Sequence, residues 1–315
     1  MNRFLYSLVL YFGIPFAIFR LLIKDTHDAS WTRKLKNQFG IVEKIPGRVI
    51  WTHCVSVGEF NASKPLIEKL MIQYPNHQII ISTTTITGFN AVNNYYKNNV
   101  KHCFFPFDIP FILDSFIRKI NPEICILLET EIWPNLIHIL KKKNIPTALI
   151  NARLSDKSFQ RYDKYSAKLV KASLNNLSLI CAQNSFSSDR FISLGANQEK
   201  MITTGSLKFD SNNTIDDKSI KTLKKIIGDR KITVFASTRE GEEKQIIKSY
   251  INSADNINSL LIIIPRHPER FNEVFKLAKA SGLKVERRST ALQCSDDTDI
   301  LIGDTMGEMM SYYSV

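Results

Sequence analysis

One carboxylate of this sequence, Glu59, falls where a strand is predicted to turn into a helix. The residues HCVSVGEFN from position 53 follow an apolar run, and they place Ser56 and Gly58 beside Glu59 at the expected helix start. A carboxylate in such a turn can take a proton from a hydroxyl group that attacks an electrophile. It can equally stabilise the positive end of the helix dipole. The position alone leaves these two roles open.

Polar residues follow two further apolar runs. The residues STTTITG from position 82 include Thr84 and Thr85 at a second expected helix start, where hydroxyl groups and free amides could hold a phosphate or a sugar. Simple capping of the helix explains at least one of them. The residues ETEIWP from position 129 place Glu129 and Glu131 on a turn fixed by Pro134. Acids at the end of a buried strand are costly unless they are paired or used.

Several cations occupy the same kind of position. Arg153 lies in NARLS, Lys208 in GSLKFD and Arg239 in STREGE, and any of these side chains could hold a phosphate or a carboxylate. The residues PRHPER, which begin with Pro265 and Arg266, gather two arginines and a histidine at one strand end. A nucleotide phosphate or an acidic sugar would suit that cluster, and a surface salt-bridge cluster is the alternative.

A glycine-containing turn, GDTMGEM, follows the last apolar run and contains Met306, Gly307 and Glu308. Such a turn before a helix can bind phosphate or ribose hydroxyls. The motifs of P-loop proteins, zinc proteases, dinucleotide-binding proteins and serine hydrolases are absent from their expected contexts.

The elements that carry these turns form a regular pattern. From residue 48, short apolar runs alternate with stretches of helical period, which is typical of βαβ units and a parallel sheet. The predicted strands are VIWTH, QIIIST, VKHCFF, EICILLE, TALIN and LSLICAQ, followed after the polar residues 210–218 by KITVFAS, SLLIIIP, GLKVERR and TDILIG. Helices are predicted over 62–73, 135–143, 242–254 and 269–281. The sequence therefore predicts two doubly wound α/β domains, residues 25–209 and 210–315, with ligands at the carboxyl ends of the strands.

The composition indicates what kind of partner the protein binds and in which cellular compartment it lies. A chain of 315 residues is longer than one hydrophobic core usually organises. Its 42 Lys and Arg against 30 Asp and Glu give a net charge of +12, which favours an anionic partner. Nucleic acid is the weaker choice because zinc-finger, RRM and long basic motifs are absent. The five widely spaced cysteines are predicted to be buried thiols in a reducing compartment.

The apolar run at residues 4–23 has the length of a membrane anchor, and Arg20 is its only charge. The basic flank predicts an uncleaved anchor over residues 1–24 with the body of the chain on the cytoplasmic side. A helix lying in the membrane interface is the close alternative, because Gly13 and Pro15 would kink a spanning helix while Tyr6 and Tyr11 suit an interface. An ordinary buried helix is the third.

Taken together, nine strings resemble the Kdo (3-deoxy-D-manno-octulosonate) transferases of lipid A biosynthesis, glycosyltransferase family 30. They occur in the order that is typical of that family, between about residues 48 and 309: WTHCVSVGEFNASKPLI, FFPFD, ETEIWPNLI, NARLSDKS, AQN, TGSLKFD, ASTREGEE, PRHPERF and GDTMGEM. The resemblance implies a GT-B architecture, in which an N-terminal acceptor domain and a C-terminal donor domain face a cleft. It also implies a place at the cytoplasmic face of the inner membrane, CMP-Kdo as donor, the tetraacyl lipid A precursor lipid IVA as acceptor, and neither metal nor cofactor.

The resemblance also assigns roles to residues. Glu59 would be the general base of an inverting transfer, and Glu129 and Lys208 would stabilise the transition state. The positions that match CMP-binding residues are Pro265, Arg266, Met306, Gly307 and Glu308. Further candidates for the cleft are Ser56, Gly58, Thr84, Thr85, Glu131, Arg153 and Arg239.

The sequence departs from the family pattern at two places, and these departures leave alternatives to an active transferase. Arg239 stands where members commonly carry His, and Val315 is the last residue although the family continues through an NPLEP-like motif. The second domain is therefore expected to be incomplete. The alternatives to a transferase are a membrane-bound remnant that binds acidic lipid without transfer, and a related GT-B sugar-nucleotide enzyme.

Overall fold

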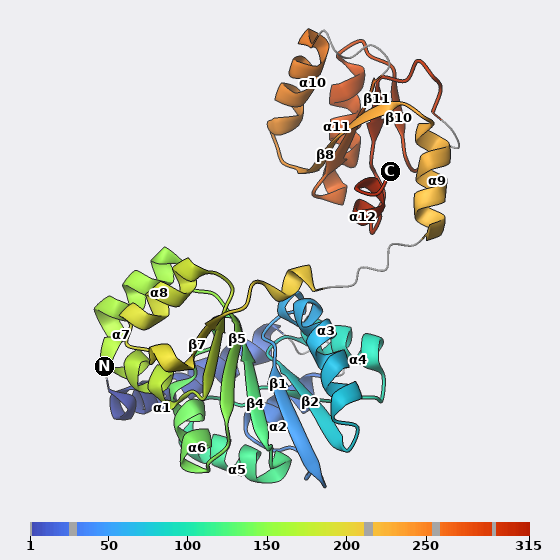
Figure 1. The fold of residues 1–315 in the computed structure, drawn as a ribbon. Coiled ribbons are helices and arrows are strands. Elements are labelled where there is room, and N and C mark those ends of the chain that lie inside the picture. Colours follow the sequence, from blue (N-terminus) through green and yellow to red (C-terminus); the bar gives the residue numbers. More distant parts are fainter. Residues whose placement is uncertain (1, 25–29, 211–216, 254–258, 292–293) are drawn as a thin grey trace. The chain divides into compact units, whose positions relative to one another are not determined.

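The computed structural model describes residues 2–24, 30–210, 217–253, 259–291 and 294–315, with the side chains of 15–24, 217 and 218 left aside. The chain divides into two compact units, Met1–Asn212 and Asn213–Val315 (Figure 1). The linker predicted over residues 210–218 falls largely on 211–216, outside the described residues.

The first unit is a seven-stranded parallel sheet between helices. Its strands are β1 (Arg48–His53), β2 (His77–Thr83), β3 (Lys101–Phe104), β4 (Ile124–Leu128), β5 (Thr147–Ala152), β6 (Leu179–Ala182) and β7 (Met201–Thr203). The main helices are α1 (Arg3–Lys24), α2 (Trp31–Gln38), α3 (Val57–Gln73), α4 (Ile86–Tyr96), α5 (Pro110–Ile120), α6 (Pro134–Lys142), α7 (Asp156–Asn176) and α8 (Ser185–Ser193). The strand order β3-β2-β1-β4-β5-β6-β7 reverses direction between β1 and β4. In doubly wound folds, ligands bind at the carboxyl ends of the strands at this reversal.

The central strands are buried on both faces, which explains their continuous apolar runs. Trp51 of β1 packs with Phe116 and Leu136 in the core on one face of the sheet. Ile50, the neighbouring residue, packs with Phe60 in the core on the other face. The parallel α/β fold predicted from the alternating runs is thus confirmed.

The second unit is a smaller parallel sheet. Its strands β8 (Lys231–Thr238), β9 (Ser259–Pro265), β10 (Val285–Arg287) and β11 (Ile300–Ile302) have the order β10-β11-β9-β8. Its helices are α9 (Asp217–Ile227), α10 (Glu242–Asn252), α11 (Phe271–Lys279) and α12 (Met309–Tyr312). All three strand pairs are parallel, so every strand ends at the same edge of this sheet.

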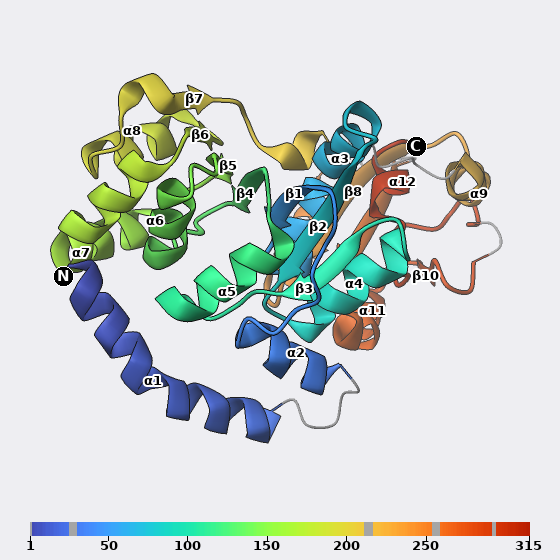
Figure 2. The ribbon, with the colours of Figure 1, turned by 90° about the horizontal axis from the view of Figure 1, so that it is seen from below.

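Helix α1 lies on the outside of the first unit (Figure 2). The Tyr6 hydroxyl donates a hydrogen bond to the carboxylate of Asp108 at 2.9 Å, and the backbone amides of Asn135 and Leu136 donate to the same carboxylate. Asp108 therefore joins α1 to the start of α6. No helix within the described residues combines the length and the apolarity that crossing a membrane needs, so the spanning form of the predicted anchor is not supported.

Local details differ from the sequence predictions at two places. Helix α3 begins at Val57, five residues before its predicted start at Ala62, because Ser56 caps it there. The short strand β7, three residues long, was not predicted. Four of the five cysteines are buried free thiols, as expected, and Cys181 is partly buried.

Candidate functional site

Glu59 lies in the first turn of α3, where β1 gives way to that helix. Its carboxylate accepts a hydrogen bond from the backbone N–H of Val55 at 2.6 Å, and the Ser56 hydroxyl lies 3.5 Å from its other oxygen. The N–H of Glu59 donates in return to the Ser56 hydroxyl at 3.4 Å. This arrangement is similar to a capping box, except that the carboxylate bonds to Val55, the residue before the N-cap Ser56. A structural role for Glu59 at the helix start is therefore present in the fold.

The surroundings of Glu59 also suit proton transfer. Burial raises the pKa of Glu59 to about 7, against the opposing effect of the Val55 hydrogen bond, and the nearby charge of Glu129 raises it further. A general base works best when its pKa lies near the operating pH. The capping role and the basic role therefore coexist in one carboxyl group.

Glu129 and Glu131 follow β4, the strand beside β1 in the sheet. The pairing of His53 with Leu127 brings the ends of these two strands together at the topological switch point. Glu129 has φ of 56°, a left-handed backbone that non-glycine residues rarely adopt, and its N–H donates to the carbonyl of Ile150 at 3.0 Å. Such strained residues gather at functional sites, where the surrounding structure holds them.

Glu131 is held in place by a tryptophan. The indole N–H of Trp133 donates to its carboxylate at 2.7 Å. Burial raises the pKa of Glu131 to about 7, and the charges of Glu59 and then Glu129 add to the effect. Repulsion between carboxylates is mutual, so Glu59 and Glu131 titrate as a pair that loses its second proton reluctantly.

His53 is a member of this cluster that the sequence analysis missed. It is fully buried, its Nδ1 contacts the hydroxyl of Ser82 at 3.0 Å, and its ring stacks on Phe105 with centroids 3.9 Å apart. Its Nε2 lies 3.8 Å from a Glu131 oxygen and has no hydrogen-bond partner within the described structure. Burial lowers the pKa of His53 to about 3, so the ring is neutral and this approach is not an ion pair. Only its position at the last residue of β1 could have signalled its place in the site.

The remaining candidates of the first unit lie around this cluster. Lys208 is exposed on a short 3-10 helix, Leu207–Phe209, which contacts α3. Thr84 donates its hydroxyl to the Val55 carbonyl at 2.9 Å, and Thr85 caps α4. The Arg153 side chain is exposed. The backbone carbonyl of Arg153 accepts a hydrogen bond at 2.8 Å from the hydroxyl of Thr130, the residue between the two glutamates. Gly58 is exposed in the first turn of α3. The fold thus brings the ends of β1, β2, β4 and β5 to one edge.

The nucleotide-site candidates of the second unit also share one sheet edge. Pro265 ends β9 and Arg266 follows it exposed, while Met306, Gly307 and Glu308 follow the neighbouring strand β11. Gly307 has φ of 86°, which favours glycine, and the Met306 side chain is exposed. Glu308 accepts a hydrogen bond from Arg288 at 2.7 Å. Arg239, at the end of β8, has an exposed side chain while its N–H donates to Glu242 at 2.7 Å.

For Arg270, the structure supports the salt-bridge alternative that was given for the predicted arginine cluster. Arg270 donates two hydrogen bonds, at 2.8 and 3.1 Å, to the fully buried carboxylate of Glu243, which also accepts from Thr238. Arg270 therefore ties α10 to the start of α11, and Arg266 and His267 remain as the exposed side chains of that turn.

The paired carboxyls predict an unusual pH dependence of stability. The folded pKa of Glu131 lies above its ordinary value of 4.5, so the fold binds more protons than the unfolded chain between pH 4.5 and about 7. The free energy of unfolding should therefore fall as pH rises through that window. Glu131→Gln, which keeps an acceptor for Trp133, should be more stable than the parent by about 1 kcal/mol at pH 8 and equal to it at pH 4.

Urea denaturation at the two pH values measures the difference. The control is Glu199→Gln, an exposed change in the same unit that should alter stability by less than about 0.5 kcal/mol at either pH. A Glu131→Gln variant that gains nothing at pH 8 would show that the Glu131 carboxylate is not strained by its neighbours.

The fold and these turns define a class of protein: an α/β chain of two parallel, doubly wound units with ligand-type turns at the strand ends of each. Solved structures of the same fold include the UDP-GlcNAc 2-epimerase of Neisseria meningitidis, with a TM-score of 0.56 at 12% identity, covering 84% of this chain and 74% of that one. MurG of Acinetobacter baumannii has a TM-score of 0.50 at 9% identity, covering 85% and 69%. Identities this low show similarity of fold alone.

Sequence relatives carry the comparison further. Residues 33–211 match the family model for 3-deoxy-D-manno-octulosonic-acid transferase (Kdo transferase). The 3-deoxy-D-manno-octulosonic acid transferase of Haemophilus influenzae is 38% identical over all of this chain and 75% of that protein. That of Bordetella pertussis is 31% identical over 84% of this chain and 63% of that protein. The chain belongs to the Kdo transferase family and is thereby a glycosyltransferase.

Proposed function

We propose that this chain transfers Kdo from CMP-Kdo to the lipid A precursor lipid IVA in lipopolysaccharide synthesis. The observation that carries the proposal is the half-buried Glu59 carboxyl, whose pKa is raised to about 7, at the switch point of the first unit. In this proposal the two units act as the acceptor and donor domains of a GT-B enzyme. The family name supports the sugar, and the assignment of the acceptor rests on the resemblance of the motifs.

The proposed mechanism is an inverting transfer without metal or cofactor. Glu59 takes the proton of the acceptor hydroxyl while that oxygen forms a bond to the anomeric carbon of Kdo and the bond to the CMP phosphate breaks. Glu129 would stabilise positive charge that develops on the sugar ring. Lys208 would support the transition state electrostatically, as the resemblance implies. In the second unit, Arg266 would bind CMP and stabilise its phosphate, because cations lower the energy of a leaving anion.

Location at the cytoplasmic face of the inner membrane is part of the same proposal. Helix α1 exposes a run of hydrophobic side chains: Phe4, Leu5, Leu8, Val9, Tyr11 and Phe12. An exposed apolar helix face can insert into the boundary between headgroups and acyl chains, and a net charge of +12 favours an acidic surface. Membrane contact through α1 would bring the first unit to a lipid acceptor.

A transfer assay tests the function directly. The chain, purified in mild detergent, is incubated with CMP-Kdo that carries a label in the sugar, and with lipid IVA. Label should pass to the lipid fraction, and calorimetry should detect binding of CMP. Binding of lipid IVA without transfer and without CMP binding would instead favour a non-catalytic lipid-binding protein.

A further inference from the structure

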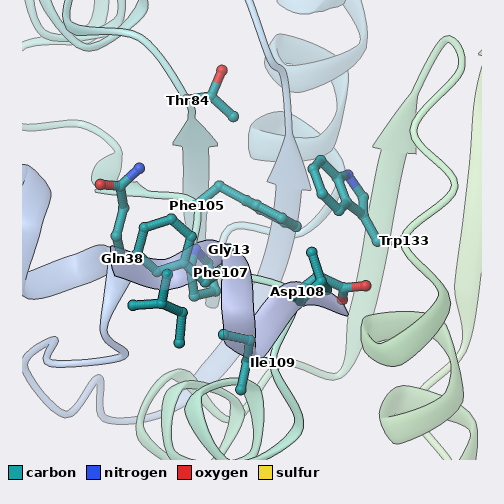
Figure 3. Close-up of a pocket in the computed structure, with 11 residues that line it drawn as sticks. Gly13, Gln38, Thr84, Phe105, Phe107, Asp108, Ile109 and Trp133 are labelled. Atoms are coloured by element: carbon teal, nitrogen blue, oxygen red, sulfur yellow. The ribbon is translucent and has the colours of Figure 1, made fainter. Parts of the chain in front are cut away.

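An apolar cavity of about 290 Å³ lies between α1 and the strand-end side of the first unit (Figure 3). Hydrophobic residues line it from both sides: Leu10, Gly13 and Ile14 of α1, and Phe105, Phe107 and Trp133 of the sheet side. At roughly 30 Å³ per water, this volume corresponds to roughly ten water-sized groups, and a methylene group is of similar size. The cavity therefore has the capacity for most of a medium-length hydrocarbon chain.

Most polar groups of the cavity wall already have hydrogen-bond partners within the protein. The carboxylate of Asp108 already accepts from Tyr6 and from the amides of Asn135 and Leu136. The hydroxyl of Thr84 donates to the Val55 carbonyl. The lining is almost entirely apolar, so the cavity favours an apolar occupant.

One polar atom of the wall is different. The side-chain oxygen of Gln38 is buried and accepts no hydrogen bond from the described residues. An orphaned buried acceptor is costly unless a ligand supplies a donor. The occupant that fits both observations is a hydrocarbon chain with one N–H or O–H group near its head.

The cavity adjoins the catalytic candidates through short contacts. Thr84, in its wall, bonds to the carbonyl of Val55, and the N–H of Val55 bonds to Glu59 at 2.6 Å. On the other side, Trp133 bonds to Glu131 and packs on Phe105 with centroids 4.9 Å apart. The wall of the cavity is therefore linked by hydrogen bonds to both glutamates.

The same helix that lines the cavity also carries the exposed hydrophobic side chains named above. The cavity is lined by Leu10, Gly13 and Ile14. The residues that precede Leu10 and Gly13 face solvent: the side chain of Val9 is 57% exposed and that of Phe12 is 78% exposed. An acyl chain that leaves a lipid layer in contact with α1 would therefore meet apolar side chains all the way to the cavity.

We propose that this cavity binds one fatty acyl chain of the acceptor, with Gln38 accepting a hydrogen bond from an amide or hydroxyl group near the head of the chain. The inference rests on the proposed function for the identity of the acceptor. It adds a site that measures acyl length and places the sugar hydroxyl toward Glu59.

Binding of glucosamine 1-phosphates that are N-acylated with chains of 4, 8 or 12 carbons tests the site in the full chain. Affinity, measured by calorimetry below the micelle concentration, should rise about fourfold per added methylene as each is buried. Gly13→Leu should lower the affinity for the 12-carbon probe at least tenfold and leave the 4-carbon probe unchanged. A Cβ at Gly13 would meet no atom within 4 Å, so the larger side chain can enter open space, and leucine also favours the helix.

Two further variants keep the test decisive. Val9→Leu adds a methylene on the exposed part of the same helix and should bind all probes like the parent. Gln38→Leu should weaken the N-acyl probes and leave dodecanoate, which lacks the donor, unaffected. Equal affinity of the parent for all three chain lengths, or of Gly13→Leu and the parent for the 12-carbon probe, would overturn the proposal.

Activity separates this inference from the proposed function. Transfer to a glucosamine disaccharide phosphate without acyl chains should be the same in Gly13→Leu and the parent, whereas transfer to lipid IVA should fall in the variant. Equal loss with both acceptors would refute the acyl site while leaving the transferase intact. Absence of any transfer by the parent, with chain-length-dependent binding retained, would refute the function and not the cavity.

Discussion

Glu59→Gln is expected to lower kcat for transfer of Kdo to lipid IVA by about 10²- to 10⁴-fold, the usual contribution of a general base. Glutamine cannot take a proton from the acceptor hydroxyl. Its side-chain oxygen can still accept the hydrogen bond from the Val55 N–H, so the start of α3 keeps this bond. The labelled-sugar assay measures the loss, and circular dichroism with thermal unfolding measures the fold.

The matched control is Glu68→Gln, on the same helix, where the exposed carboxylate contacts only the hydroxyl of Tyr95 at 2.7 Å among the hydrogen bonds of the described structure. It should retain parental turnover. If Glu59→Gln loses activity only in proportion to a loss of folded protein, the carboxylate is a helix cap and not the base.

The pH profile sharpens the same prediction. Because the pKa of Glu59 is raised to about 7, activity should fall as pH drops through that value and the base becomes protonated. Glu131→Gln removes a neighbouring negative charge, so the acidic limb of kcat/KM should move to lower pH in that variant. An unmoved limb would mean that the two carboxyl groups do not interact in the working enzyme.

Arg270→Met should destabilise the second unit by about 3–5 kcal/mol, the usual result of removing one partner of a buried ion pair. Glu243 is fully buried, and two of its hydrogen bonds come from Arg270. Burial would raise the pKa of Glu243, but the bonds from Arg270 and Thr238 outweigh it and lower the pKa. The pair thus contributes stability above the ordinary pKa of a glutamate, and this contribution disappears as pH falls through the lowered pKa.

Arg266→Met is the control, since it alters the same turn but removes an exposed side chain. Its stability should stay within about 0.5 kcal/mol of the parent, whereas its affinity for CMP should fall if Arg266 binds the phosphate. Hydrogen exchange of amides in β8 and β9, followed by mass spectrometry, reports on this unit alone. Equal stability of the two arginine variants would contradict the structural role assigned to Arg270.

The sequence by itself predicts most of the strands and the strand ends at which the candidate site residues lie. Apolar runs such as ICILL and SLLIIIP are buried on both faces in parallel strands, so the run alone predicts them. A strand that ends in polar residues before a helical period also predicts that those residues lie at the sheet edge, as Glu59, Glu129 and Arg266 do.

Tertiary structure alone decided which of these residues interact. Strand order places β4 beside β1 although two other strands come between them in the sequence, and this pairing brings Glu131 to Glu59 and His53. Periodicity reports only which face of an element is apolar, so it could not separate Arg270, bound to Glu243, from Arg266 in solvent. The apolar cavity under α1 depends on residues more than 120 positions apart, because empty space is a property of packing and leaves no local pattern in a sequence.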